Sequence, residues 1–231
     1  MTLNNNTAYH VEELVIEVGR QCNMRCPHCL RGEPQNLAID TSYIQKLLSS
    51  VSSISTLVLT GGEPFLYPSK IRFIVNEIIK RKISIDNFFI ATNGTVKSFD
   101  VIDSLLKLYN ICNETDLCGL KISTDSYHDA YKDIWKALYG LSFTYEGKDI
   151  PEEYLLSEGR ADGVYDTQRE PSDTLTELND SNIAGMIYLA ANGNILIGCD
   201  YSYINQEEHA IGNIRNSSFQ DIIQKLSVLP A

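Results

Sequence analysis

Basic residues are scarce in this chain of 231 residues, which has 19 lysines and arginines against 30 aspartates and glutamates. The formal net charge is −11. Because binding to a nucleic-acid backbone usually depends on basic patches, we expect no nucleic-acid partner. An acidic surface most often serves solubility, and a cationic substrate such as a basic peptide is the functional alternative.

Long hydrophobic runs are also absent. No apolar stretch approaches the roughly 20 residues that a membrane span requires, so we expect no membrane association. Residues 1–6 contain neither the basic region nor the apolar region of a secretory signal, which favours a cytoplasmic location. In that compartment we expect the six cysteines to be free thiols rather than a disulfide framework.

The apolar pattern predicts strands that alternate with helices, in a chain long enough for one sizeable domain. We expect strands at 11–18, 54–60, 83–92 and 117–124, and helices at about 43–51, 71–79, 102–109 and 125–139. Asp40 or Thr41 would cap the first helix. Repeated units of this kind with short connections form parallel sheets with right-handed crossovers. Functional groups should therefore gather at the carboxyl ends of the strands.

The pattern weakens after the fourth helix. Residues 140–182 are rich in Gly, Pro, Asp, Glu and Ser, and we expect mostly loop there, with a short strand at 154–157. The segments 183–190 and 194–198 should form a hairpin around an Asn-Gly turn. Ser217 would then cap a closing helix.

Three cysteines lie within one short segment after the first strand: Cys22, Cys26 and Cys29, in a C-x3-C-x2-C spacing. Three thiolates on one loop can hold three irons of a cubane iron–sulfur cluster and leave the fourth iron open to a small molecule. A structural zinc site is the alternative. Zinc favours four ligands in paired spacings, however, and His28 would have to fold back on its own loop to complete the set. The sequence therefore favours an iron–sulfur site that performs chemistry.

This spacing resembles that of the radical S-adenosylmethionine (SAM) superfamily. The resemblance implies that the three cysteines ligate a [4Fe–4S] cluster and that SAM chelates the open iron through its amino and carboxylate groups. One electron from the reduced cluster then breaks SAM into methionine and a 5′-deoxyadenosyl radical, which abstracts a hydrogen from the substrate. The protein positions and shields this chemistry. An electron donor such as flavodoxin or ferredoxin is implied as a partner.

Two further segments resemble SAM-binding motifs of that family. Gly61-Gly62-Glu63-Pro64 follows the second strand, where the glycines allow close approach of the backbone. In the family the carboxylate of this segment meets the SAM amino group, whereas on its own the segment would be only a tight turn. Ser123 and Asp125, at the end of the fourth strand, would hold the ribose or the carboxylate of SAM. Asp125 or Ser126 could instead simply cap the following helix.

Three single residues extend the set of cofactor-binding candidates. Arg160 resembles an arginine that pairs with the SAM carboxylate in peptide-modifying members, and a guanidinium fork suits that role. A surface salt bridge is the alternative. His28 stands where the family most often has an aromatic residue against the adenine. Asn93 follows the third strand, where the family often has Asn-Gly, although that pair is also a common turn. The sequence leaves the catalytic side chains unassigned.

The C-terminal part resembles the start of a SPASM or twitch extension, which carries an auxiliary cluster in many relatives. A hairpin that ends in Cys199 precedes Ile211-Gly212-Asn213-Ile214 and a short helix. The later cysteines of such an extension are missing, and Cys112 and Cys118 belong to a different part of the predicted sheet. We therefore expect no auxiliary cluster, with Cys199 either a vestige of that extension or a packing residue.

Together these features predict an α/β fold, an open partial (β/α)6 barrel of the radical SAM type with a short C-terminal β-hairpin plus helix. We expect a barrel domain at 1–182 and a truncated SPASM/twitch-like tail at 183–231 that packs on it. The tail favours an enzyme that modifies a peptide or protein side chain. Because about ten residues precede the first strand, a separate protein would have to supply any leader-peptide-binding domain.

Other functions stay open on the sequence alone. The chain could be a radical SAM enzyme for a small molecule, a nucleotide or a sugar, enclosed by residues 140–182. It could be an activase that makes a glycyl radical on a partner enzyme. The alternative outside enzymes is a metal-bound interaction module.

Overall fold

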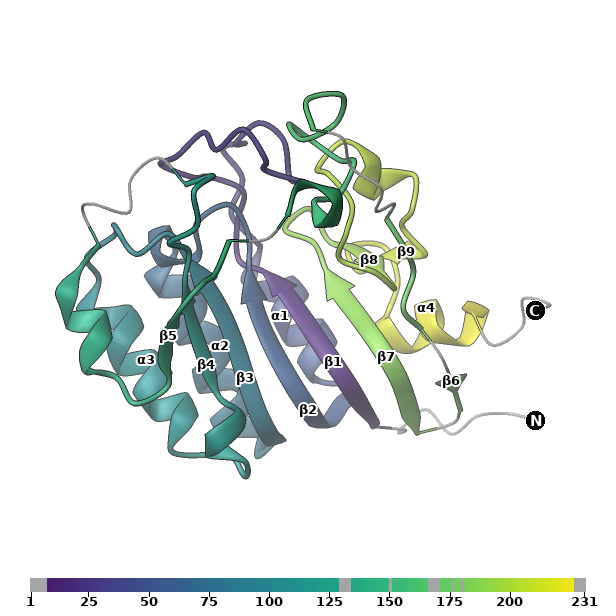
Figure 1. Ribbon diagram of the computed structural model, residues 1–231. Coiled ribbons are helices and arrows are strands. Elements are labelled where there is room, and N and C mark those ends of the chain that lie inside the picture. The colour runs from purple at the N-terminus through teal and green to yellow at the C-terminus, as the bar shows by residue number, and fades with distance from the viewer. Residues whose placement is uncertain are drawn as a thin grey trace.

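The computed structural model describes residues 8–128, 134–149, 151–165, 171–175, 177–179 and 181–226. In this part of the chain a single sheet crosses the molecule, helices pack behind it, and loops gather above the carboxyl ends of its main strands (Figure 1). No helix among these residues is long and apolar enough to cross a bilayer.

The elements follow one another in the order strand, helix, strand over the first half of the chain. The strands are β1 (Tyr9–Glu17), β2 (Val51–Thr60), β3 (Ser84–Thr92), β4 (Gly119–Ile122), β5 (Thr144–Glu146), β6 (Glu177–Leu178), β7 (Asn182–Leu189), β8 (Asn194–Leu196) and β9 (Gly212–Asn213). The α-helices are α1 (Thr41–Leu48), α2 (Pro68–Arg81), α3 (Phe99–Tyr109) and α4 (Phe219–Leu226). Short 3-10 helices lie at Pro64–Leu66, Thr115–Leu117, Lys136–Gly140, Glu152–Tyr154 and Asn205–Glu207.

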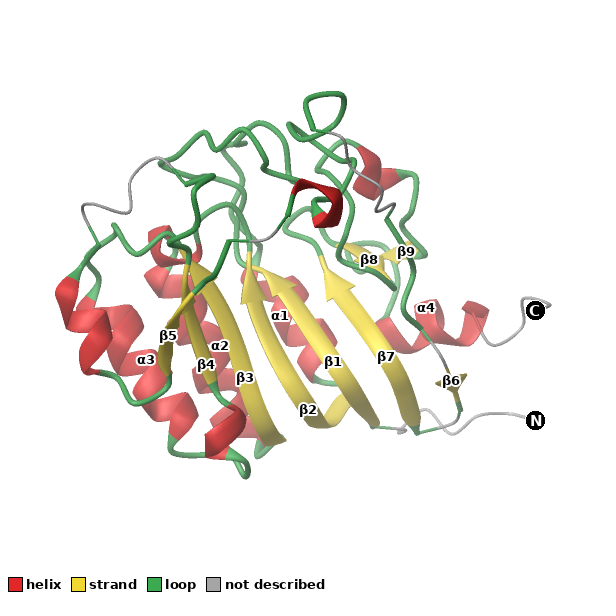
Figure 2. Cartoon of the chain, viewed as in Figure 1, coloured by secondary structure: helices red, strands yellow, loops and turns green. Residues whose placement is uncertain are grey.

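Six neighbouring strands of the sheet are parallel. Their order is β5-β4-β3-β2-β1-β7, and every neighbouring pair in that run has parallel register. Beyond β7 the sheet continues with the antiparallel strands β8 and β9, and β6 also pairs with β7. Among the described strands the two ends of this order do not pair with each other (Figure 2). The sheet is therefore an unclosed barrel, as the sequence predicts.

Helices α1, α2 and α3 cover one face of the sheet and bury their apolar stripes against it (Figure 1). Helix α2 shows the pattern, because its buried apolar residues are spaced three and four apart: Ile71, Ile74, Val75 and Ile78. Its first turn starts at Pro68, and its last turn is closed by Lys82 in the left-handed conformation. The strands supply the opposing layer of this buried core, and the loops of the site extend from the ends of these strands.

The first four predicted strands and the first three predicted helices are confirmed, with small shifts at their ends. Asp40 caps α1 by accepting a hydrogen bond from the Ser42 N–H at 2.8 Å. The predicted fourth helix is wrong for the described residues. The chain turns at 125–128 and forms only the 3-10 helix Lys136–Gly140, while 129–133 lie outside the described residues. At 125–128 and 134–139 the apolar spacing is thus not enough to sustain an α-helix.

Three details further along the chain also differ from prediction. The strand expected at 154–157 is absent there, and Glu152–Tyr154 forms a 3-10 helix. The fifth parallel strand is β5 instead, whose three residues are too few to show a strand periodicity. The closing helix is capped by Ser218 rather than Ser217, because the Ser218 Oγ accepts the Asp221 N–H at 3.1 Å.

The predicted hairpin is confirmed as β7 and β8, joined through a turn at Asn192-Gly193. Strand β7 also pairs in parallel with β1 along most of its length. One sheet thus contains strands from both sides of the boundary expected between residues 182 and 183, and the division into two units stays a prediction. Helix α4 packs below the hairpin, where Phe219 meets Tyr9 edge to face with ring centroids 5.9 Å apart.

Candidate active site

A cavity of about 280 Å³ opens at the carboxyl ends of the parallel strands. Loops that follow β1, β2, β3 and β4 all contribute to its wall. The wall contains ten of the eleven residues expected at the site: Cys22, Cys26, His28, Cys29, Gly61, Gly62, Glu63, Asn93, Ser123 and Arg160. The remaining one, Asp125, lies beside the wall through its contact with His128. The structure thus brings together residues that are up to 138 positions apart in the sequence.

The two glycines after β2 allow two backbone segments to touch. The Gly62 N–H donates to the Gly19 carbonyl at 3.0 Å, and the Glu63 N–H donates to the Gln21 carbonyl at 2.8 Å. A Cβ on Gly61 would overlap the carbonyl oxygen of Gly19, and Gly61 has a φ of +152°. The glycines therefore join this loop to the start of the cysteine loop, a closer backbone contact than the sequence suggests.

Glu63 is fully buried and holds the loop that follows β3. Its carboxylate accepts the Thr92 hydroxyl at 2.7 Å and the Asn93 N–H at 2.8 Å, as well as the Phe65 N–H at 3.0 Å. Burial raises the pKa of Glu63, while the hydrogen bonds from Asn93, Phe65 and Thr92 oppose that rise. The sequence predicts that this carboxylate binds a ligand. The structure shows that it also holds the loop after β3 through Thr92 and Asn93.

Asn93 links the same loop to the cysteine loop. Its Nδ2 donates to Asn23 Oδ1 at 2.9 Å, and Asn23 in turn donates to Thr95 Oγ1 at 2.9 Å. Asn23 lies between Cys22 and Cys26. The loops after β1 and β3 are therefore fixed relative to each other by side-chain amides, and the sequence gives no signal for the part played by Asn23.

Arg160 holds the cysteine loop from its other side. Its Nε donates to the Cys26 carbonyl at 3.0 Å, and its backbone N–H donates to the Cys29 carbonyl at 2.9 Å. Its Nη1 also lies 3.3 Å from the exposed carboxylate of Glu33. The surface ion pair considered as an alternative is therefore present, while the guanidinium also lines the cavity.

A cluster of rings and one carboxylate forms the wall near β4. The His28 ring lies 5.0 Å from Tyr127 and 4.8 Å from His128, centroid to centroid, and Asp125 accepts from the His128 Nδ1 at 2.6 Å. Burial lowers the pKa of His28 to about 4. Asp125 also accepts the Tyr127 N–H at 3.2 Å, which is a local turn contact. His28, Asp125 and His128 have donor types that can bind a metal ion, with ligand atoms within 4.8 Å of one another. The adenine contact expected of His28 stays a prediction.

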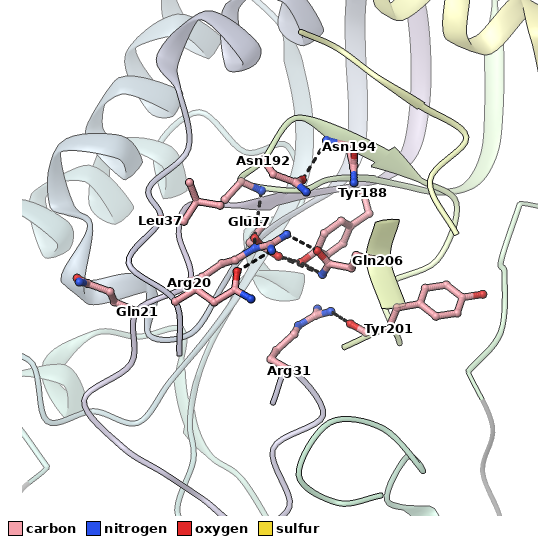
Figure 3. A network of polar contacts seen from close by, with 12 residues as sticks. Glu17, Arg20, Gln21, Arg31, Leu37, Tyr188, Asn192, Asn194, Tyr201 and Gln206 are labelled. Carbon is pink, nitrogen blue, oxygen red and sulfur yellow. Dashed lines mark hydrogen bonds and ion pairs between the residues drawn. The ribbon is translucent and has the colours of Figure 1, made fainter. Parts of the chain in front are cut away.

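A buried polar network lies behind the cysteine loop (Figure 3). Arg20 Nε and Glu17 Oε1 form an ion pair at 2.6 Å, and both side chains are almost completely buried. Gln206, from the C-terminal part, accepts from Arg20 at 2.6 Å and donates to Glu17 at 3.2 Å. The Tyr188 hydroxyl of β7 donates to the second Glu17 oxygen at 2.5 Å. The network ties residues 188–206 to the strand that leads into the cysteine loop.

Arg31 makes a second connection to the same part of the chain. Its Nη1 donates to the Tyr201 carbonyl at 2.7 Å, and its guanidinium lies 5.1 Å from the centre of the Tyr188 ring. The Tyr203 N–H donates back to the Arg31 carbonyl at 3.2 Å. Arg31 also lines the cavity. Sequence reasoning missed both Arg20 and Arg31, because no motif marks a buried arginine.

The other three cysteines lie away from the cavity wall. The backbone of Cys112 pairs with that of Ile85 in an isolated parallel β-bridge, and Cys118 precedes β4. Burial and the neighbouring Cys118 thiol raise the pKa of Cys112. Cys199 packs against the small cluster formed by Val15, Tyr188 and their neighbours. The packing role expected for Cys199 agrees with this position.

The donor set fits a cluster with one open corner. All three loop cysteines are free thiols and line the same cavity, whose wall also contains Glu63, Ser123 and Arg160. Thiolates are the ligands that iron–sulfur clusters take in proteins. Among the described residues of this wall there is no fourth cysteine.

Comparison with known proteins agrees with this geometry. The family model described as the radical SAM superfamily matches residues 16–143, more than half of the chain. A GTP 3',8-cyclase from Chlorobaculum tepidum is 29% identical over 135 residues, which are 55% of this chain and 40% of that protein. The chain therefore spans less than half the length of this relative.

One solved structure supports the same fold, and a second is reported with it. The structure of BtrN in an open conformation superposes with a TM-score of 0.53 at 15% identity, over 92% of this chain and 79% of that one. Streptococcus suis SuiB bound to its precursor peptide SuiA has a TM-score of 0.49 at 13% identity, over 94% of this chain and 65% of that one.

A cysteine-lined cavity at the open end of a partial parallel barrel, together with the family-model match, defines an enzyme of the radical SAM type. The chain belongs to the radical SAM superfamily. The cofactors of this family are a [4Fe–4S] cluster and SAM.

Proposed function

We propose that Cys22, Cys26 and Cys29 hold the [4Fe–4S] cluster and that SAM binds in the adjoining cavity. The single observation that carries this proposal is the convergence of the cysteine loop and the Gly61–Glu63 loop on one cavity. With both cofactors bound, reductive cleavage of SAM supplies a 5′-deoxyadenosyl radical that abstracts a hydrogen from the substrate.

The residues of the chain would then bind and orient the cofactors. Glu63 and Ser123 are proposed to hold the polar groups of SAM. Gly61 and Gly62 have no side chains, so the ligand can approach their backbone closely. Arg160 is proposed to pair with the SAM carboxylate, and its Nε contact with the Cys26 carbonyl supports a position beside the cysteine loop. The apolar layer beneath the cavity limits access of water from the core side.

An anaerobic reconstitution experiment tests the cofactor part of this proposal. We expect about four irons per chain and formation of 5′-deoxyadenosine from SAM when dithionite is the reductant. Cys26→Ala should lose both the iron and the cleavage product. Cys118→Ala is the matched control, since Cys118 is also buried but lies outside the cavity. Equal iron and equal cleavage in Cys26→Ala would contradict the assignment.

We further propose that the substrate is a peptide or protein side chain. Support comes from the C-terminal part, where the β7–β8 hairpin, Cys199, the segment with β9 and helix α4 follow in the order of a SPASM-like tail. A separate leader-peptide-binding protein, an electron donor such as flavodoxin or ferredoxin and a cytoplasmic location complete this proposal. An oxygen-sensitive cluster suits that compartment.

A nucleotide substrate is the second candidate, and one observation favours it. The 29% identity to a GTP 3',8-cyclase covers 135 residues, although only 40% of that relative is spanned. Two incubations with SAM and dithionite separate the candidates. In one, a short peptide encoded beside the gene should change in mass; in the other, GTP should be unchanged. Consumption of GTP with an unaltered peptide would favour the nucleotide.

A further inference from the structure

The inner face of the sheet carries an apolar surface that the described helices do not cover. Helices α1, α2 and α3 pack on the opposite face (Figure 1). On the inner face Val58 of β2 is aligned with Phe89 of β3, and both side chains are only partly buried. Parallel sheets normally have both faces covered. A partly exposed apolar floor beside a cavity is therefore a surface on which a ligand can lie.

An aromatic side chain extends this floor toward the edge of the sheet. Gly119 of β4 is aligned with Phe89, and a Cβ on Gly119 would lie 3.1 Å from the Tyr145 ring and 3.4 Å from the Phe89 ring. The two rings therefore approach each other over Gly119. Tyr145 remains 47% exposed. Together Phe89 and Tyr145 offer a flat apolar surface to a substrate.

Lys121 lies in the next row of the same face. Its neighbours in β4, Leu120 and Ile122, are fully buried in the helix-side core, so Lys121 points to the inner face. Across the sheet it is aligned with Ala91 on one side and Tyr145 on the other. Ala91 lines the cavity, so Lys121 stands in the strand next to the cavity wall.

The positive charge of Lys121 has no acidic partner among the described residues. Its ammonium extends along the neighbouring strand, because Nζ lies 3.7 Å from the place that a Cβ on Gly147 would occupy. Glu17 points to the same face at the end of β1, but Arg20 neutralises it at 2.6 Å. Glu13 lies further down β1, and burial together with Glu12 raises its pKa. Lys121 is therefore a cation without an acidic partner, one strand away from a residue of the cavity wall.

We propose that Lys121 binds a carboxylate of a peptide substrate, with the neighbouring apolar part of the peptide on Phe89 and Tyr145. This inference rests on the proposed peptide substrate and names a property of it: an acidic residue close to the residue that reacts. A single ammonium suits a single carboxylate. A polyphosphate would bring several negative charges, whereas the two arginines of the cavity wall are engaged with the Tyr201 carbonyl and with Glu33, and Lys121 is the one lysine or arginine in the described strands. The local charge of this face thus favours an acidic peptide although the chain is acidic overall.

Selection from a random peptide library tests the proposal. The reconstituted protein with SAM bound is held under anaerobic conditions and presented with displayed pentapeptides. We expect enrichment of Asp or Glu at one position, and a loss of roughly tenfold in that enrichment with Lys121→Met. Lys121→Glu should reverse the preference to Lys or Arg, and Lys121→Arg should keep it.

Lys107→Glu is the matched control, because it makes the same change of charge on the outer face of α3, where Lys107 pairs with Asp103 at 2.8 Å. Iron content and circular dichroism confirm that each variant is folded. Enriched peptides with no charge preference would overturn the role of Lys121 and leave a peptide substrate standing. If no peptide is enriched while GTP binds the same protein in calorimetry, the peptide substrate fails and this inference fails with it.

Discussion

At the scale of single residues, the buried pair of Glu17 and Arg20 depends on a third side chain. Both charged groups are removed from water, so each polar atom left without a partner is costly. Gln206 is 1% exposed and bonds both members of the pair, which lets one neutral amide complete the network. A residue 186 positions from Arg20 thus supports the start of the cysteine loop.

Replacement of Gln206 by alanine should therefore destabilise the fold. The change leaves an Arg20 N–H unpaired in the interior and removes one of the two hydrogen bonds to Glu17 Oε2, which keeps its bond from Tyr188. We expect a loss of about 1–3 kcal/mol in the free energy of unfolding. Urea denaturation followed by circular dichroism measures it. Gln45→Ala, on the exposed face of α1, is the control and should change stability by less than about 0.5 kcal/mol. Equal effects of the two changes would show that the network carries no stability.

Cys199 should be a slow nucleophile. Burial raises the pKa of its thiol to about 11, with Asp200 and Glu13 adding to the rise against the opposing effect of Arg31. Because the thiolate is the reactive form, a rise of roughly two pKa units lowers the thiolate fraction at pH 8 about 100-fold. We expect alkylation of Cys199 by iodoacetamide to stay slow at pH 8 and to accelerate as the pH approaches 11. Peptide mass spectrometry measures it, and the same cysteine in guanidinium-unfolded protein is the control. Rapid alkylation of Cys199 at pH 8 in the folded protein would contradict the burial argument.

At the scale of elements, long periodic segments were predictable and short or irregular ones were not. The stripe of α2 and the β-branched run of β2 identify their elements because each satisfies one period over several turns or residues. Strand β5 has only three residues, and its place is set by pairing with β4 across the sheet. The positions of the site loops follow from parallel strand order alone. The buried contacts of Arg20, Arg31 and Gln206 depend on distant partners that no local pattern reveals.

The turn after β2 is the element on which the cysteine loop rests. Gly61→Ala would place a methyl group against the Gly19 carbonyl at a φ of +152°, which L-residues rarely adopt. We expect a loss of about 3 kcal/mol in stability and a lower iron content after reconstitution, because the two loops can no longer meet. Thermal denaturation and iron analysis measure the two effects. Gly140→Ala, with no atom within 4 Å of its added methyl group, should stay within about 1 kcal/mol of the parent protein. A Gly61→Ala protein with normal stability and iron content would show that this contact is dispensable.

At the scale of the whole molecule, β1 is the central element of the fold. It pairs with β2 on one side and with β7 on the other, and it leads directly into the cysteine loop. Residues from the N-terminal strand and from the C-terminal hairpin therefore share one hydrogen-bonded core. Strand β5, by contrast, stands at the open end of the sheet with a neighbour only in β4 among the described strands (Figure 2).

This arrangement predicts an order of local stability that hydrogen exchange can measure. Opening β1 disrupts two ladders and exposes residues such as Leu14 and Ile16, which are fully buried, so its amides should exchange only through global unfolding. The amides of β5 need only local opening at an edge and should exchange much sooner. Peptide-level exchange with mass spectrometry compares the two strands in one sample, and mild urea should accelerate β1 more steeply than β5, because global unfolding exposes more surface. Similar exchange rates in β1 and β5, with the same urea dependence, would mean that the sheet opens as one unit. Pairing with two neighbours would then give β1 no additional local stability.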